Sequence, residues 1–315
     1  MTIERDADTP RTLAFSTRAK VGNLKHNADL TVTDLGNLML NEGGEAKGKR
    51  PASALNSKEA FRLIGSRQPV IFLDYDGTLT KIVKDPSKAK MSKETRNVVR
   101  QLSKLCEVAI LSGRDAEDVK KLVKIDHIAY AGSHGFDILT ADGKRKNSRR
   151  WNAFLPIIDR AERDLRRRTK GISGVLVERK KFAISVHFRN VSASQIKELE
   201  KHFNSVASCF SRKLRKSKGK KVFELLPKVK WNKGKALLYL MRAFGLSKEK
   251  EFIPVFLGDD LTDEDAFRVL REDGVGIIVG NEFNPNTLAR FSLRNPEEVR
   301  RFLEKVKRNL EERKA

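Results

Sequence analysis

The sequence predicts an α/β protein in which a parallel sheet forms the core and an α+β module is inserted into it. Apolar runs of strand length alternate with amphipathic helical segments on both sides of the module, which is typical of parallel strands joined by right-handed crossovers. Between them, in 139–230, strands follow one another closely, which is typical of an antiparallel sheet. With 315 residues, of which 39% are hydrophobic, the chain is long enough to bury such a core.

Residues 1–57 are predicted to form a disordered basic tail. They show no sustained periodicity and end in NEGGEAKGKRPASALNS, which has too few apolar residues to offset the entropy of ordering. Asn56 or Ser57 can cap a short helix, so the folded part is expected to begin at residue 58. The first core segment, 58–138, is expected to hold strands at 70–76 and 107–113 and helices at 92–105 and 115–123.

The inserted module is expected to span 139–230, and the core to resume over 231–315. Periodicity in the module predicts helices at 151–169 and 192–208 and strands at 174–178, 181–189 and 221–227. The second core segment is expected to contain a helix at 232–244, a strand at 252–260, a helix at 263–272, a strand at 274–280 and a last helix from Pro296.

Three apolar core strands end in polar residues. VIFL is followed by Asp74 and Asp76, VAIL by Ser112, and PVFLG by Asp259 and Asp260. Because the carboxyl ends of parallel strands share one edge of a sheet, where ligands bind, these side chains are expected to gather there. Clustered carboxylates repel one another unless a cation lies among them, and a set of oxygen ligands favours Mg²⁺ over zinc. A single aspartate at a strand end is an ordinary turn former, but two such pairs with a Ser-Gly between them indicate a site.

Four motifs in chain order resemble those of the haloacid dehalogenase-like phosphohydrolases. They are DYDGT (74–78), SGR (112–114), the lysine of WNKGKA (231–236) and GDDLTDED (258–265). Further segments are similar to trehalose-6-phosphate phosphatases, especially those of plants: AGSHGFDI (131–138), VERKKFAISVHFR (177–189) and KVFELLP (221–227). The resemblance implies a Rossmann-like hydrolase core with an inserted α+β cap, and Mg²⁺-dependent hydrolysis of trehalose 6-phosphate through an aspartyl phosphate.

The resemblance assigns roles that the chemistry supports. Asp74 would be the nucleophile, and Asp76 would protonate the leaving sugar oxygen and later take a proton from water. Thr78 would brace the loop, Ser112 would hydrogen-bond a phosphoryl oxygen, and Lys233 would offset the charge that develops on the transferred group. Taken without the resemblance, Lys233 also fits a solvated lysine at a helix start.

The same resemblance implies a Mg²⁺ site. Asp259 would bind the ion directly, together with Asp74 and the backbone carbonyl of Asp76, while Asp260 and Asp263 would orient metal-bound waters.

The module would close over the strand ends and recognise the sugar. A disaccharide presents many hydroxyls, so its pocket needs acceptors for them and cations for the phosphate; the candidates are Glu178, Lys180, His187, Arg189 and Glu224 on the module and His134 at a core strand end. Alternation places Glu178 and Lys180 on one face of their strand, and His187 and Arg189 on one face of the next. One departure from the family pattern is Leu226, where the relatives usually have arginine; it puts affinity or selectivity for the substrate in question.

Catalysis does not account for the basic composition. The chain has 65 Lys and Arg against 41 Asp and Glu, a formal net charge of +24, so its field attracts anions. The clusters RDLRRRTK and SRKLRKSKGKK fit solvated faces, nucleic-acid binding or a nuclear address. Since no aromatic interleaving or nucleic-acid motif accompanies them, the expected partner is a small-molecule substrate, with only weak, non-specific binding to nucleic acid.

Two cysteines predict neither a disulfide framework nor a cysteine metal site, and no apolar stretch reaches the ~18 residues of a membrane span. A cytoplasmic location without membrane partners is therefore expected, with plastid and nucleus left open. Two alternative functions remain at this point: a phosphatase for another sugar phosphate, and a non-catalytic regulatory protein that binds a sugar phosphate or a polyanion.

Overall fold

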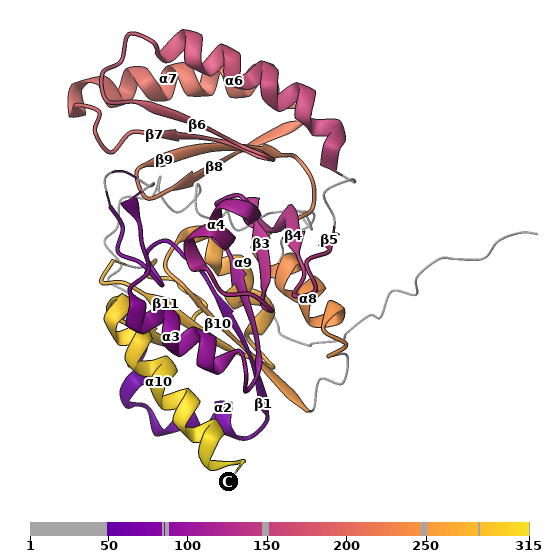
Figure 1. The fold of residues 1–315 in the computed structure, drawn as a ribbon. Coiled ribbons are helices and arrows are strands. Elements are labelled where there is room, and N and C mark those ends of the chain that lie inside the picture. The colour runs from indigo at the N-terminus through magenta and orange to yellow at the C-terminus, as the bar shows by residue number, and fades with distance from the viewer. Residues whose placement is uncertain are drawn as a thin grey trace, which may run out of the picture. The chain divides into compact units, whose positions relative to one another are not determined.

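The structure, a computed structural model, describes residues 49–314 except 84, 86–87, 147–150, 247–250 and 283. Its main feature is a sheet of strand order β12-β11-β10-β1-β2-β3-β4-β5 (Figure 1). The strands from β12 to β3 pair in parallel, and β4 and β5 continue the sheet in antiparallel fashion. The parallel α/β core expected from the alternation is confirmed. Its strands are β1 (Gln68–Leu73), β2 (Glu107–Leu111), β3 (Ala129–Gly132), β4 (Asp137–Leu139), β5 (Arg145–Lys146), β10 (Phe252–Gly258), β11 (Val275–Val279) and β12 (Phe291–Leu293).

Helices cover both faces of this sheet. One apolar cluster joins the sheet to α2, α3, α4 and α10, and another joins its opposite face to α8 and α9. Local signals fix the helix starts, as where the Ser92 hydroxyl accepts from the Thr95 amide and Asn295 caps α10 directly before Pro296. The helices are α2 (Lys58–Gly65), α3 (Lys93–Leu102), α4 (Ala116–Val123), α8 (Lys233–Ala243), α9 (Glu264–Leu270) and α10 (Pro296–Glu312).

A second, antiparallel sheet has the order β6-β7-β9-β8. Figure 1 shows α6 and α7 along one face of it, where an apolar cluster including Leu165, Phe203 and Phe223 is buried. The other face carries polar residues, because alternate positions of each strand point to opposite sides. The elements are β6 (Leu176–Lys180), β7 (Ala183–His187), β8 (Leu214–Gly219), β9 (Val222–Pro227), α6 (Leu155–Thr169) and α7 (Ala193–Cys209).

Three short strands, β5, β8 and β12, were not predicted from the sequence. β8 lies in the segment expected only as a basic cluster, and β12 has three residues, too few to show a period. β5 lies inside the range expected for the inserted module, yet it pairs with β4 of the core sheet. β7 ends at His187, so Arg189 lies beyond the strand and not on its face as expected.

The expected tail boundary at residue 57 also differs from the structure. Residues 1–48 lie outside the described part of the chain, but the segment after them packs on the core. Ala54 and Leu55 are buried, the Ser292 amide donates to the Ala52 carbonyl, and the Arg50 guanidinium donates to the carbonyls of Gly280 and Leu293. These contacts come from segments far apart in the sequence, which is why local composition did not reveal them. Within the described ranges, no helix is both long enough and apolar enough to cross a membrane.

Candidate active site

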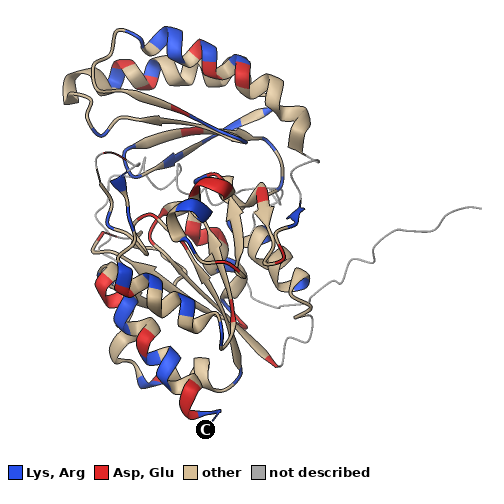
Figure 2. Cartoon of the chain, in the orientation of Figure 1, with Lys and Arg blue, Asp and Glu red and all other residues tan. Residues whose placement is uncertain are grey.

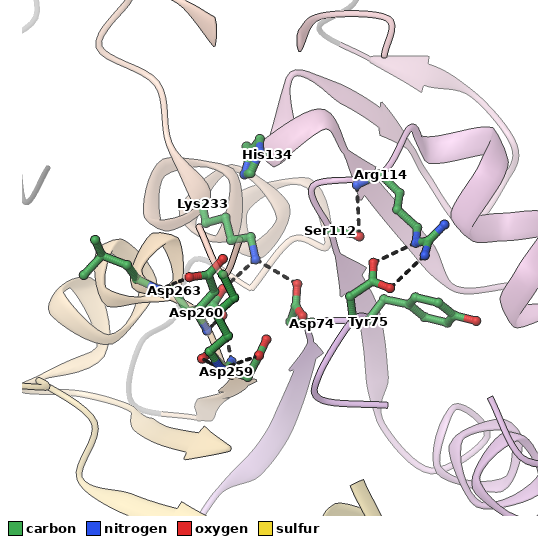
Figure 3. A network of polar contacts seen from close by, with 12 residues as sticks. Asp74, Tyr75, Ser112, Arg114, His134, Lys233, Asp259, Asp260 and Asp263 are labelled. Atoms are coloured by element: carbon green, nitrogen blue, oxygen red, sulfur yellow. Dashed lines mark hydrogen bonds and ion pairs between the residues drawn. The ribbon is translucent and has the colours of Figure 1, made fainter. Parts of the chain in front are cut away.

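Asp74 lies at the carboxyl end of β1, next to the first residue of α8. Its side chain is buried, and the Lys233 ammonium donates to Asp74 Oδ1 at 2.8 Å and to Asp263 Oδ1 at 2.5 Å (Figure 3). Lys233 is only 3% exposed, which excludes the solvated alternative. Burial and the nearby carboxylates of Asp263 and Asp259 raise the pKa of Asp74 well above its ordinary value, in spite of Lys233. Burial and neighbouring carboxylates therefore destabilise the negative charge of Asp74, which lies beside the fixed ammonium group of Lys233.

Three carboxylates meet at this edge of the sheet. One oxygen atom each of Asp74, Asp259 and Asp263 lies within 4.8 Å of the others. Burial, and after it repulsion from Asp263 and Asp260, raises the pKa of Asp259 to about 7. The second oxygen of Asp263 accepts from the backbone amides of Asp259 and Asp260, at 2.8 and 2.9 Å, and so holds the loop after β10 in place. This buried, oxygen-only and negatively charged set fits a hard divalent cation such as Mg²⁺.

The turn after Asp74 brings the two motifs together. Gly77 has φ +86°, and a β-carbon there would lie 2.1 Å from Asp259 Oδ2, so both the backbone conformation and the approach of Asp259 require glycine. The Gly77 amide donates to the Thr80 carbonyl at 2.9 Å and closes the turn. Thr78, expected to brace this loop, is fully buried, but its hydroxyl has no hydrogen-bond partner among the described residues. The backbone bond to Thr80 thus closes the turn that Thr78 was expected to brace.

Ser112 and Asp76 lie beside Arg114. The Arg114 amide donates to Ser112 Oγ at 3.1 Å, and its guanidinium forms two bonds to Asp76, Nε to Oδ2 at 2.7 Å and Nη2 to Oδ1 at 2.8 Å. Arg114 is the third residue of the SGR motif, and the sequence alone indicates no role for it. The pairing of its guanidinium with Asp76 could not be predicted from the sequence, because the two residues are 38 positions apart.

The polar face of the second sheet carries paired charges. Glu224 accepts from the Lys180 ammonium at 3.1 Å and from the Ser185 hydroxyl at 2.7 Å, and His134 Nε2 of the core lies 3.0 Å from its other oxygen. Burial alone would raise the pKa of Glu224, but Lys180 and His134 hold it well below its ordinary value. Glu178 is paired in the same way with His187 at 2.7 Å.

Two contacts between the sheets involve residues that the sequence analysis missed. Lys220, in the turn between β8 and β9, donates to the Asp259 carbonyl at 2.7 Å and to Asp259 Oδ2 at 2.8 Å. Asp115 begins α4, but its carboxylate does not cap that helix; it accepts from the Lys181 amide at 2.9 Å and from the Ser133 hydroxyl at 2.6 Å. In the sequence, Lys220 is part of a basic cluster and Asp115 is the first residue of the helix expected at 115–123, so neither pattern indicated these contacts.

Leu226, the residue that departs from the family pattern, lies opposite a basic residue. Leu226 is buried in β9, and Arg215 of β8 pairs directly with it. Residues directly opposite in an antiparallel ladder share a face, so this face keeps a cation next to Leu226. Burial raises the pKa of Asp265 in α9, and the positive charge of Arg215 opposes this rise, so Arg215 lies close enough to act on the core.

One cavity unites these groups. It is lined from the core by Asp74, Asp76, Ser112, Arg114, His134, Lys233, Asp259 and Asp260, and from the second sheet and its turns by Glu178, Lys180, His187, Arg189, Lys220 and Glu224. Apart from Thr78 and Asp263, all the site residues expected from sequence therefore face one space. The arrangement places the buried Asp74 carboxylate and a candidate cation site opposite the paired charges of the second sheet.

Comparison with known proteins identifies relatives across most of the chain. Residues 72–296 match the family model described as trehalose-phosphatase. A probable trehalose-phosphate phosphatase H of Arabidopsis thaliana is 41% identical over 82% of this chain and 77% of its own length. Trehalose-phosphate phosphatase B of the same plant is 40% identical over 81% of this chain and 70% of its own length.

Solved structures share the fold. A trehalose-6-phosphate phosphatase related protein is 27% identical, with a TM-score of 0.67, over 78% of this chain and all of its own. The C-terminal domain of the C. albicans trehalose-6-phosphate phosphatase has a TM-score of 0.70 at 24% identity over 83% of this chain and 99% of its own. A haloacid dehalogenase-like hydrolase from Bacteroides thetaiotaomicron, 16% identical over 76% of this chain and 100% of its own, has a TM-score of 0.54. These last two likenesses concern the fold alone.

Proposed function

The chain belongs to the trehalose-phosphatase family, and from this premise we propose that it hydrolyses trehalose 6-phosphate to trehalose and phosphate. The observation that carries the proposal is the buried Asp74, held at 2.8 Å by Lys233 in a cavity whose opposite wall carries Lys180 and Glu224. The core supplies a nucleophile, and the second sheet supplies hydrogen-bonding groups for a sugar.

In the first step, an oxygen of Asp74 attacks phosphorus. The bond between phosphorus and the sugar oxygen breaks, its electron pair stays on that oxygen, and the oxygen takes the proton of the Asp76 carboxyl group. The products are free trehalose and an acyl phosphate on Asp74. Lys233 lies where it offsets charge on the transferred group, and the Ser112 hydroxyl hydrogen-bonds a phosphoryl oxygen.

In the second step, water attacks the phosphorus of the acyl phosphate. Its proton passes to the Asp76 carboxylate, the bond between phosphorus and the Asp74 oxygen breaks, and inorganic phosphate leaves with both aspartates restored. Dividing the reaction in this way replaces one difficult displacement by two easier ones.

We infer that Mg²⁺ is the cofactor, held by Asp74 and Asp259 with the Asp76 carbonyl, while Asp263 fixes the loop and Asp260 lines the site. When bound, Mg²⁺ would neutralise the phosphate and the clustered carboxylates of Asp74 and Asp259, whose pKa values are raised first by burial and then by repulsion between neighbouring carboxylates.

The second sheet acts as a cap that excludes water and recognises the sugar. Glu178 and Glu224 offer acceptors for hydroxyls, and Lys180, His187 and Arg189 offer donors, while His134 lines the same cavity with its Nε2 on Glu224. This assignment supports a disaccharide phosphate rather than a small phosphate ester.

The test is phosphate release from trehalose 6-phosphate and a panel of other sugar phosphates, with Mg²⁺ and with EDTA. We expect Mg²⁺-dependent release that is fastest with trehalose 6-phosphate. Equal rates across the panel would favour a broader sugar phosphatase, an alternative that Leu226 keeps open, and no release from any substrate would favour a regulatory binding protein.

Partners and location follow from the same proposal. Figure 2 shows blue and red residues intermixed along α6 and α7, and Arg166, Arg167 and Arg179 pair with carboxylates. These pairs support solvated faces, so we propose only weak, salt-sensitive binding to nucleic acid. The cytoplasmic location expected from the sequence stays a prediction.

A further inference from the structure

We propose that Arg114 is a positioning residue that fixes the Asp76 carboxyl group for proton transfer to the leaving oxygen. The proposal rests on the function given above, and it assigns a role to the third residue of the SGR motif. The contact that carries it is the double hydrogen bond between the Arg114 guanidinium and both Asp76 oxygens, at 2.7 and 2.8 Å.

Arg114 is the fixed member of this pair. Its side chain is 8% exposed, whereas that of Asp76 is 42% exposed. Arg114 Nη1 also donates to Asp118 at 3.2 Å, and the guanidinium carbon lies 5.6 Å from the centre of the Tyr75 ring. The arginine therefore has one orientation, and it imposes that orientation on a carboxylate that would otherwise turn freely at the cavity surface.

The backbone of Arg114 ties this orientation to the phosphate site. Its amide donates to Ser112 Oγ at 3.1 Å, and its carbonyl accepts from the Ser133 amide at 2.6 Å. One residue thus joins the group proposed to bind phosphate to the group proposed to move the proton. A relative displacement of about 1 Å between such groups reduces a rate by about a hundred-fold.

The pairing leaves Asp76 able to react. A carboxylate has about four lone-pair sites, of which the fork of Arg114 takes two, so one oxygen can still face the leaving group. A lysine at this position would keep the charge but not the second hydrogen bond, because an ammonium group lacks the planar fork. Replacing Arg114 by lysine or by glutamine therefore distinguishes the effect of its positive charge from its effect on the orientation of Asp76.

Proton donation matters in proportion to the basicity of the leaving oxygen. p-Nitrophenolate leaves as a stable anion, whereas phenolate and a sugar alkoxide are more basic and need the proton. Neither aryl phosphate carries the sugar hydroxyls that the cap would contact. Comparing phenyl phosphate with p-nitrophenyl phosphate therefore isolates proton transfer from sugar recognition.

The experiment measures kcat/KM for both aryl phosphates and for trehalose 6-phosphate in wild type, Arg114→Gln, Arg114→Lys and Asp76→Asn. We expect Arg114→Gln to lose about 10- to 100-fold on phenyl phosphate and trehalose 6-phosphate and less than about 3-fold on p-nitrophenyl phosphate. Arg114→Lys should fall between Arg114→Gln and wild type. Arg179→Gln is the matched control, because Arg179 makes two hydrogen bonds to Asp159 on the outside of the cap and is expected to leave all three values unchanged.

A double-mutant cycle gives the second measurement. If Arg114 acts through Asp76, Arg114→Gln has no further effect on the residual trehalose 6-phosphate rate in an Asp76→Asn background. Equal losses on both aryl phosphates, or a full further loss in that background, would overturn the proposal in favour of a structural or phosphate-binding role. Failure of wild type to hydrolyse trehalose 6-phosphate would instead reject the proposed function, and the aryl phosphates would still test Arg114.

Discussion

The two walls of the cavity differ in how far their buried carboxylates are balanced by cations. On the core side, three carboxylates share the ammonium groups of Lys233 and Lys220, and burial with mutual repulsion raises the pKa values of Asp74 and Asp259. On the cap side, Glu224 is matched by Lys180 and His134, and its pKa is lowered. The negative charge of the core wall is only partly balanced, and a bound cation would balance it further. The cap wall is complete, so sugar hydroxyls must compete with pairs that already exist.

This difference separates chemistry from recognition. Substitutions on the core wall are expected to affect every phosphate ester, whereas substitutions on the cap wall are expected to affect only esters large enough to reach it.

The largest expected effect is that of Asp74→Asn. An amide cannot form the acyl phosphate, so kcat/KM should fall by more than about 10³-fold on trehalose 6-phosphate and on p-nitrophenyl phosphate alike. The fold should persist, because the substitution removes one of three repelling carboxylates. Phosphate release and thermal melting measure both; a well-folded variant with nearly normal turnover would show that Asp74 is not the nucleophile.

Glu224→Ala should produce a smaller loss that depends on the substrate. It removes an acceptor and leaves Lys180 buried without its partner, so kcat/KM on trehalose 6-phosphate should fall about 10- to 100-fold. p-Nitrophenyl phosphate has no sugar hydroxyls for Glu224 to bind, so it should be hydrolysed at close to the wild-type rate. Glu178→Ala should behave similarly; equal losses on both substrates would mean that these glutamates support the fold or the core chemistry.

The sequence predicted the core wall better than the contacts between the walls. Asp74, Ser112 and Asp259 were predictable because they end apolar strands, and parallel strands must bring their carboxyl ends to one edge. β8 was not, because LRKSKG carries polar residues toward both faces and so shows no alternation. The contacts of Asp115 and Lys220 depend on how the cap meets the core, which no local pattern encodes.

Asp115→Ala tests one of these contacts between the walls. The variant loses the acceptor for the Lys181 amide, next to Lys180, and should lose about 1 kcal/mol of binding, or about 5-fold, seen mainly as a higher KM for trehalose 6-phosphate. Glu117→Ala is the control, since Glu117 is exposed on the same helix and pairs with Arg145. A fall in kcat on p-nitrophenyl phosphate as well would place Asp115 in the core chemistry.

Lys220→Met tests whether the core wall lacks a cation. The Lys220 ammonium donates to the Asp259 carbonyl and to Asp259 Oδ2, so it competes with a cation for this carboxylate, and its removal should tighten Mg²⁺ binding several-fold in calorimetric titration. Lys221→Met is the control: it removes a positive charge from the next residue and should leave the affinity for Mg²⁺ as in wild type. Weaker binding in Lys220→Met would mean that Lys220 assists the metal instead of competing with it.

The smallest expected effect on activity is that of removing residues 1–48, since no catalytic motif lies there. Removal of 1–57 is a different experiment: it also deletes Arg50, which donates to two carbonyls beside β12, and Leu55, which is 4% exposed. Loss of one buried leucine costs about 2 kcal/mol, so the longer truncation should melt several degrees lower while the shorter one melts like the full chain. Both should keep the ratio of trehalose 6-phosphate to p-nitrophenyl phosphate turnover, because no catalytic motif lies in 1–48 and residues 49–57 do not line the cavity. A changed ratio in the shorter truncation would show that residues 1–48 contribute to the site.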